Sequence, residues 1–288
     1  MRQTRRVMGI FHSGSCPVCA VSRKNFEECS KMKSKSLVLV VVGVLLLCMC
    51  IASVSAEPVH NLNSGKNFTT IQSAIYDAAT LTGHTILVDS GVYHENVQVS
   101  KSITLRGNDT GTGYPVVDAD NTGNAIRITQ NGTILKNFKV INGSSSIAGI
   151  YVYSSHNIIT DIDVSVNRAW GIQLSNSENN TISHISGENN AQSLVSLSSS
   201  NNNRILNISS NGNYGIISLG TSNFNLIENC TIKNSTGVAM YIQSSNNNLI
   251  NNNSISNSSE GIRLEYKSQY NIVSNNDLQN NSLAIDFN

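Results

Sequence analysis

Apolar residues alternate with polar ones in short runs that recur every 22 or 23 residues over the second half of the chain. One apolar column comprises Ile150, Ile172, Val195, Ile217, Met240, Ile262 and Ile285. A second column follows two residues later in each run and comprises Val152, Leu174, Leu197, Leu219, Ile242, Leu264 and Phe287. Alternation with a period of two predicts short strands that each bury one face.

A Ser-x-x-Asn motif keeps the same interval and gives one Asn in each repeat. These residues are Asn157, Asn180, Asn203, Asn225, Asn248 and Asn271. If each repeat forms one coil, identical residues lie about 4.8 Å above one another. We therefore predict that these six residues form a structural ladder of side-chain hydrogen bonds.

Each repeat holds about three strands separated by Gly, Asn and Ser turns, which is too short a segment to bury a core alone. Stacked coils bury such strands together. The pattern predicts an all-β fold, a right-handed parallel β-helix of eight or nine coils, with the regular Asn-rich repeats at 131–288.

The residues before the regular repeats predict further strands and one helix. Strands are expected at 85–88, 97–99 and 103–105, and 125–128 matches 149–152 one coil earlier. Residues 69–80 have helical apolar spacing, with a capping box at Thr69 and Gln72 and with Gly83 beyond the end. We predict that this helix covers the first coil, because an open coil exposes a sheet edge.

The segment from Phe68 to Ile75, with Gly91–Val97 and Lys101–Gly107, resembles the cap and first coil of right-handed parallel β-helices. The Asn-rich repeats resemble NosD-type repeat proteins, grouped as carbohydrate-binding and sugar-hydrolase modules, and especially secreted surface proteins of methanogens. The resemblance spans about residues 60–288.

The catalytic motifs of related β-helix enzymes are absent from the sequence. The chain has no Gln-Asp or Gly-Arg-Pro-Trp segment of pectin methylesterases and none of the motifs of polygalacturonases or pectate lyases. Acidic residues are also scattered, whereas glycoside hydrolysis normally needs two carboxylates at a set separation. The sequence favours a protein that is not an enzyme.

The first 56 residues differ from the rest of the chain. A basic stretch at 31–36, an apolar run at 37–52 and Ser53–Ala56 predict a signal peptide at 32–56, with an uncleaved membrane anchor as the alternative. Residues 1–31 are interpreted as a misassigned start or an unstructured extension. Cys16 and Cys19 have the spacing of half a zinc site or of a redox pair. The β-helix domain is expected at 57–288.

The same two regions, residues 1–56 and 57–288, also differ in net charge. Residues 57–288 carry 11 Lys and Arg against 16 Asp and Glu, which gives about −5 and argues against nucleic acid as a partner. From Asn131 onward, 33 of 158 residues are Asn, a share that ordinary globular domains do not reach. Eleven Asn-x-Ser/Thr sequons suit an exported glycoprotein.

Outward positions between the two apolar columns hold candidate site residues. The candidates for saccharide binding are Arg127, Tyr151, Gln173, Tyr241 and Arg263, with Trp170 nearby on a turn; an ordinary solvated strand face is the alternative. Asp161 and His184 are 23 residues apart and should lie one above the other, as a catalytic pair or a simple surface ion pair. The histidines form no His-x-His motif, so we expect no metal site and no cofactor.

These observations lead to one main hypothesis and two alternatives. The main one is an exported, cell-surface or secreted β-helix with a structural, adhesive or saccharide-binding role, whose partner is a polysaccharide or an envelope glycan. The alternatives are a polysaccharide lyase or hydrolase with an atypical site near Tyr151, Asp161, Gln173 and His184, and a NosD-like periplasmic accessory protein for copper-site maturation. Membrane contact is expected only through an uncleaved signal segment. A partner or further domain is expected on the open C-terminal coil.

Overall fold

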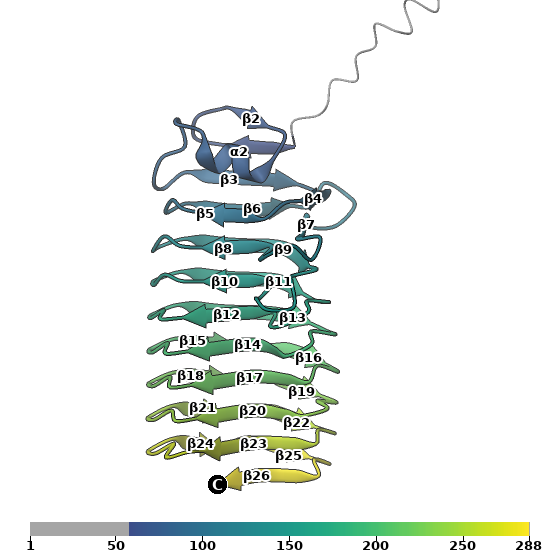
Figure 1. Cartoon of the computed structure of the whole chain (residues 1–288), viewed down its shortest axis with the longest axis vertical. Coiled ribbons are helices and arrows are strands. Elements are labelled where there is room, and N and C mark those ends of the chain that lie inside the picture. The colour runs from purple at the N-terminus through teal and green to yellow at the C-terminus, as the bar shows by residue number, and fades with distance from the viewer. Residues whose placement is uncertain (1–57, 288) are drawn as a thin grey trace, which may run out of the picture. The chain divides into compact units, whose positions relative to one another are not determined.

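The computed structural model describes residues 58–287, and these residues form a column of stacked coils (Figure 1). The predicted signal peptide, the segment before it and the Cys16–Cys19 pair lie outside the described residues. No helix in the described part is long and apolar enough to cross a membrane.

A nine-stranded sheet receives one strand from each coil, and all its strands are parallel. Its strands are β5 (Val97–Val99), β8 (Ile126–Ile128), β10 (Ile150–Val152), β12 (Ile172–Ser175), β14 (Ser193–Ser198), β17 (Gly215–Gly220), β20 (Val238–Gln243), β23 (Glu260–Glu265) and β26 (Leu283–Phe287). Neighbouring strands pair in the register that the two apolar columns predict, for example Ile150 with Ile172.

The second sheet has seventeen strands and covers the other side of the column. Its first strands are β1 (Val59–Asn61), β2 (Asn67–Phe68), β3 (Thr85–Asp89), β4 (Val92–His94), β6 (Thr104–Asn108), β7 (Val116–Asp118), β9 (Ile134–Ile141), β11 (Ile158–Val164) and β13 (Thr181–Gly187). The later ones are β15 (Arg204–Leu206), β16 (Ser209–Asn211), β18 (Leu226–Glu228), β19 (Thr231–Lys233), β21 (Leu249–Asn251), β22 (Ser254–Ser256), β24 (Ile272–Ser274) and β25 (Asp277–Gln279). From β15 onward each coil gives this sheet two short strands, so each later coil has three strands.

The apolar columns form the interior of the column. Ile126, Ile150, Ile172, Val195, Ile217, Met240 and Ile262 are each at most 1% exposed. Because each coil adds one residue to every column, the apolar core runs continuously from coil to coil. The all-β parallel β-helix predicted from the sequence is confirmed.

The capping helix is shorter than predicted. Helix α2 spans Ile71–Tyr76 instead of 69–80, and its N-cap is Thr70, whose side chain accepts from the Ser73 amide, instead of Thr69. The helix ends at Asp77, whose carboxylate accepts the Ala79 amide and pairs with Lys66. An Asx turn therefore takes the place of the expected last helical turn. Ile71, Ala74 and Ile75 are buried, so the short helix still contributes to the core.

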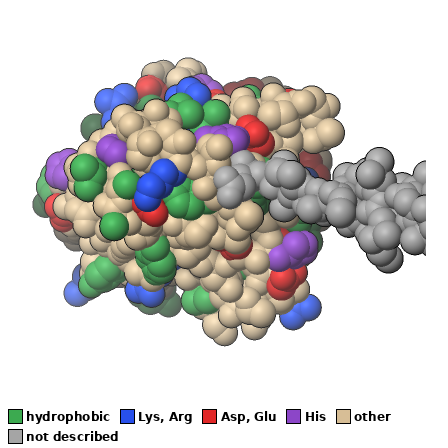
Figure 2. Space-filling model, turned by 90° about the horizontal axis from the view of Figure 1, so that it is seen from above, with side chains coloured by type: hydrophobic (Ala, Val, Ile, Leu, Met, Phe, Trp, Pro, Cys, Tyr) green, Lys and Arg blue, Asp and Glu red, His purple; other side chains and the backbone are tan. Residues whose placement is uncertain are grey.

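Viewed from the cap end, the surface consists mostly of uncharged polar side chains and backbone (Figure 2). Basic, acidic and histidine side chains are scattered over this face, and none of the three kinds gathers into one large patch. The visible part of this face therefore mixes side chains of both charge signs.

Candidate functional site

The outward positions of the nine-stranded sheet form one continuous row. Successive register partners in this row are Gln98, Arg127, Tyr151, Gln173, Ser196, Ser218, Tyr241, Arg263 and Asp286. From Gln98 to Arg263, each side chain points away from the core because its two neighbours on the strand are buried. Three of the six saccharide-binding candidates, Arg127, Tyr151 and Gln173, lie toward one end of this row, and Tyr241 and Arg263 lie near its far end.

Arg127, Tyr151, Trp170 and Gln173 line one hollow of about 520 Å³. Asn124, Ser146 and Ile147 complete its lining. Adjacent strands β8, β10 and β12 supply three of the four side chains. Trp170 comes from the turn before β12, where its carbonyl accepts the Gly149 amide at 3.0 Å. The stacking of coils therefore gathers residues that are far apart in the sequence.

The guanidinium of Arg127 is the charged group of this hollow. Its Cζ atom lies 5.7 Å from the centroid of the Tyr151 ring, which is a cation–π geometry. Arg127 is exposed and forms no ion pair with any residue of 58–287. The hollow thus offers a cation, two aromatic rings and an amide, which can hold a polar ring-shaped ligand from its face and its edge.

Tyr241 and Arg263 line a separate hollow of about 470 Å³. Here the candidate groups already bind one another. Arg263 forms ion pairs with Glu260, with Glu265 at 3.3 Å and with Asp286 at 3.3 Å. The Tyr241 hydroxyl donates to Glu265 at 2.6 Å. Partial burial and the Glu265 carboxylate raise the pKa of Tyr241 to about 12. A ligand at this hollow would have to displace these pairs.

Asp161 and His184 lie one above the other, as the repeat predicts, but not beside Tyr151 and Gln173. They belong to β11 and β13 of the seventeen-stranded sheet and line a different hollow, of about 540 Å³. His184 Nδ1 is 4.0 Å from Asp161 Oδ1, and both side chains are at least half exposed. His184 also contacts Asn207 at 3.2 Å. The structure therefore does not join the four residues of the enzyme hypothesis into one site.

The six Asn residues predicted to form a ladder all lie at one corner of successive coils. From Asn157 to Asn248, each donates its backbone amide to the Oδ1 atom of the next at 2.8–2.9 Å. Each Nδ2 also donates to that oxygen, at 2.9–3.2 Å. Five of the six are at most 2% exposed, so the row satisfies polar groups that would otherwise be buried unpaired.

Two features of the surface have no counterpart in the sequence prediction. Tyr153 stacks on Tyr151, with ring centroids 6.5 Å apart, and extends the aromatic surface beside the first hollow. A hollow of about 610 Å³ over the seventeen-stranded sheet is lined by hydroxyl and amide groups together with Lys139, Lys233, Asp163 and Glu188. The contact between Tyr151 and Tyr153 could have been identified from the sequence, since residues two apart on a strand share a face. The second is lined mainly by strands β9, β11, β13, β16 and β19, and the repeat alone does not show that this face is hollow.

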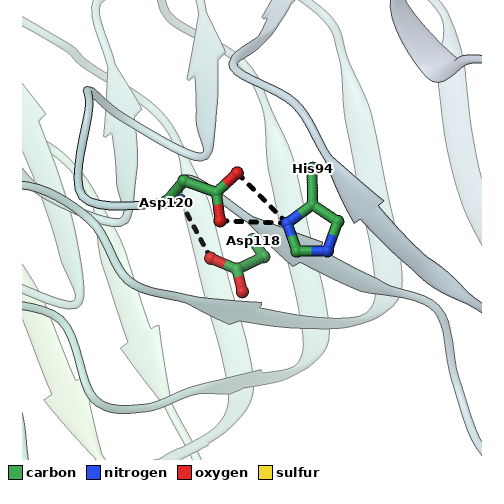
Figure 3. Close-up of side chains that lie close together, drawn as sticks. All are labelled: His94, Asp118 and Asp120. Atoms are coloured by element: carbon green, nitrogen blue, oxygen red, sulfur yellow. Dashed lines mark hydrogen bonds and ion pairs between the residues drawn. The ribbon is translucent and has the colours of Figure 1, made fainter.

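A possible metal-binding group lies near the cap, at the ends of β4 and β7 (Figure 3). His94, Asp118 and Asp120 each offer one ligand atom, and these atoms lie within 4.8 Å of one another. His94 Nδ1 is 2.9 and 3.1 Å from the two carboxylate oxygens of Asp120. The three residues are up to 26 positions apart in the sequence, so no compact sequence motif indicated this group.

Comparison with known proteins agrees with the fold. Residues 59–288 match the family described as "Periplasmic copper-binding protein (NosD)". Over 93 residues the chain is 39% identical to a cell surface glycoprotein of Methanothermus fervidus, which is 32% of this chain and 15% of that protein. The chain thus matches only a small part of that relative's length. The expected resemblance to NosD-type and methanogen surface proteins is confirmed.

Two solved structures share the fold at low sequence identity. The enzymatically active domain of tailspike protein 2 of bacteriophage CBA120 aligns with a TM-score of 0.52 and 14% identity, over 70% of this chain and 41% of that one. ORF18 of Geobacillus virus E2 aligns with a TM-score of 0.51 and 12% identity, over 73% and 54%. These likenesses concern the fold alone.

Proposed function

The chain belongs to the NosD family, and on that basis we propose that it is an extracytoplasmic β-helix protein that binds saccharide on its nine-stranded sheet. The location is supported by the periplasmic description of the family and by the cell surface glycoprotein of Methanothermus fervidus. Both describe proteins outside the cytoplasm. The binding role is carried by the hollow at Arg127, Tyr151, Trp170 and Gln173.

The unpaired guanidinium of Arg127 beside the Tyr151 ring is the observation that supports this proposal most directly. A sugar ring presents apolar C–H faces and hydroxyl edges. Tyr151 and Trp170 can pack against the faces, while Arg127 and Gln173 can bond to hydroxyl or carboxylate oxygens. Tyr153 extends the stacking surface along the row. An ordinary solvated strand face does not require an unpaired guanidinium, two aromatic rings and an amide side by side.

The test is equilibrium binding of the full chain to a panel of neutral and acidic polysaccharides. We expect Tyr151→Ala and Arg127→Gln each to weaken binding by about tenfold, which corresponds to roughly 1.4 kcal/mol. Tyr270→Ala is the matched control, because Tyr270 is an exposed tyrosine that lines neither hollow of the nine-stranded sheet. Unchanged binding in Tyr151→Ala and Arg127→Gln, or an equal loss in Tyr270→Ala, would contradict the assignment.

The same samples test the enzyme alternative. New chain ends released from a bound polysaccharide would show turnover. We expect none, because the candidate acid–base residues Asp161 and His184 lie on the other sheet. Release of chain ends that Asp161→Ala abolishes would replace binding by catalysis as the function.

The family description names copper, but the side chains of the described residues do not suit Cu(I) as ligands. Cu(I) prefers thiolate and thioether ligands. In residues 58–287 these are Cys230 and Met240, and both are buried. Burial raises the pKa of the Cys230 thiol to about 12, which keeps it protonated. We therefore assign no copper step to this part of the chain.

A further inference from the structure

The cluster of His94, Asp118 and Asp120 contains a buried carboxylate that pairs with no lysine or arginine of residues 58–287. Asp118 is 8% exposed. Its Oδ1 atom accepts from the Asp120 amide and from Asn142 Nδ2, both at 2.9 Å. Among residues 58–287 no Lys or Arg forms an ion pair with it. Buried carboxylates are normally paired with a cation or coordinate a metal.

The groups next to Asp118 increase the need for a cation. His94 is its register partner on the neighbouring coil, and Asp120 follows two residues later in a left-handed turn with φ of 49°. The cluster therefore brings two carboxyl groups and one imidazole together. Two carboxylates held together repel each other unless a positive charge lies between them.

The donor atoms of His94 and Asp120 lie close to the spacing of two ligands on one metal ion. His94 Nδ1 lies 2.9 and 3.1 Å from the Asp120 oxygens. Two ligands about 2.1 Å from a common tetrahedral ion are about 3.4 Å apart, so the two side chains would separate slightly when an ion binds. The side chains of His94 and Asp120 are 59% and 55% exposed, so an ion can reach them from solvent and keep water ligands.

We propose that His94, Asp118 and Asp120 bind a divalent transition-metal ion of the Zn²⁺ type. One imidazole nitrogen and two carboxylates suit such an ion, whereas a soft monovalent ion would need sulfur. Asn142 positions Asp118 through its amide, in the way that a second layer of hydrogen bonds commonly orients metal ligands. The bound ion would tie two neighbouring coils together near the cap.

The experiment is calorimetric titration of the full chain with Zn²⁺ after its accessible thiols are alkylated, because five cysteines precede residue 57. Wild type is expected to bind one more ion than His94→Ala. Asp120→Asn preserves the shape and the left-handed turn, and it is expected to weaken that site by at least about tenfold. Zn²⁺ should raise the thermal midpoint of wild type by more than that of either variant.

His184→Ala is the matched control, since His184 is an equally exposed histidine beside a single aspartate. It should bind Zn²⁺ as wild type does. A spectroscopic readout supplements the titration: with Cu²⁺ as the probe, electron paramagnetic resonance should show coupling to one nitrogen in wild type and lose it in His94→Ala. Equal Zn²⁺ binding by wild type, His94→Ala and Asp120→Asn would overturn the proposal, as would binding of Cu⁺ without Zn²⁺.

Discussion

At the scale of single residues, the abundance of Asn has two separate causes. One is the buried ladder. The other is backbone conformation, because 27 described residues other than Gly have positive φ and 15 of them are Asn. Asn tolerates the left-handed region better than most residues since its short side chain can bond locally. The exposed Asn residues at the corners of the coils thus have a conformational reason, separate from the ladder.

Val166 occupies such a left-handed corner position although its side chain is β-branched. Its φ is 58° and its side chain is 52% exposed, so a β-branched residue is strained there without gaining burial. Asn189 takes the same corner one coil later, also with φ of 58°. We expect Val166→Asn to stabilise the protein by about 1 kcal/mol. The reciprocal Asn189→Val should destabilise it by a similar amount. The midpoint of urea unfolding measures both, and equal midpoints would contradict the strain argument.

Cys230 should be chemically inert in the folded protein. Burial raises its pKa from 9.0 to about 12, so it stays a thiol at pH 9, where a cysteine with a pKa of 9.0 is about half thiolate. A raised folded-state pKa also means that its contribution to stability is complete below about pH 9 and is lost as the pH rises toward 12. Iodoacetamide at pH 9 followed by peptide mapping should leave Cys230 unmodified until denaturant is added. Modification of the native protein would show that the thiol is accessible.

At the scale of elements, buried polar rows link the coils at three corners. Besides the row that begins at Asn157, a second runs from Asn167 through Asn190 to Asn213. A third runs from Cys230 through Asn253 to Asn276. In the third row polar residues continue a column that begins with Ile162, Ile185 and Ile208. The corner at which a coil turns therefore accepts an apolar side chain or a hydrogen-bonded Asn.

Asn203, in the middle of the first row, provides the test of this linkage. Its Oδ1 accepts from the backbone and side chain of Asn180, and its Nδ2 donates to Ser177 and Asn225. Asn203→Ala leaves buried groups unpaired on both neighbouring coils and should destabilise the protein by at least about 2 kcal/mol. Asn202→Gly is the matched control at the adjacent left-handed position, and it should change stability by less than about 0.5 kcal/mol. Urea unfolding of both variants makes the comparison. Similar losses in both would mean that the corner conformation, and not the buried row, stabilises the coils.

The sequence predicts elements well where the repeat is regular, and less well elsewhere. Columns such as Ile150 and Ile172 establish strand register because a shift of one residue would expose the whole apolar face. The cap has no repeat to guide it, and Asp77 ends α2 through contacts with Lys66 and Ala79 that its helical spacing does not reveal. The hollow at Arg127 was predictable from the same columns. The cluster at His94 was not, because the coil between His94 and Asp118 is irregular in length.

At the scale of the whole described unit, the two sheets present different chemical groups at their surfaces. The nine-stranded sheet presents aromatic and basic groups at one end of its outward row and a network of Arg263 with three carboxylates near the other. The seventeen-stranded sheet presents the Asp161–His184 pair and the hollow with Lys139 and Lys233. A long ligand that follows the row would meet the cationic end and the acidic end in order. Binding on the nine-stranded sheet would therefore favour one direction of the ligand chain.

A column of coils should also unfold gradually, since each coil contacts only its neighbours. The middle coils bury their apolar columns completely, as at Ile217 and Met240. In the last coils Val273, Leu278 and Ile285 are only partly buried and Phe287 is 72% exposed, so less apolar area resists opening there. Hydrogen exchange followed by mass spectrometry should show the slowest amides in β12 to β20 and progressively faster exchange toward β26. Asn203→Ala should speed exchange most in the coils on either side of it. Uniform exchange across residues 58–287, or a uniform response to that substitution, would show that the coils unfold as one cooperative unit and would contradict nearest-neighbour stability.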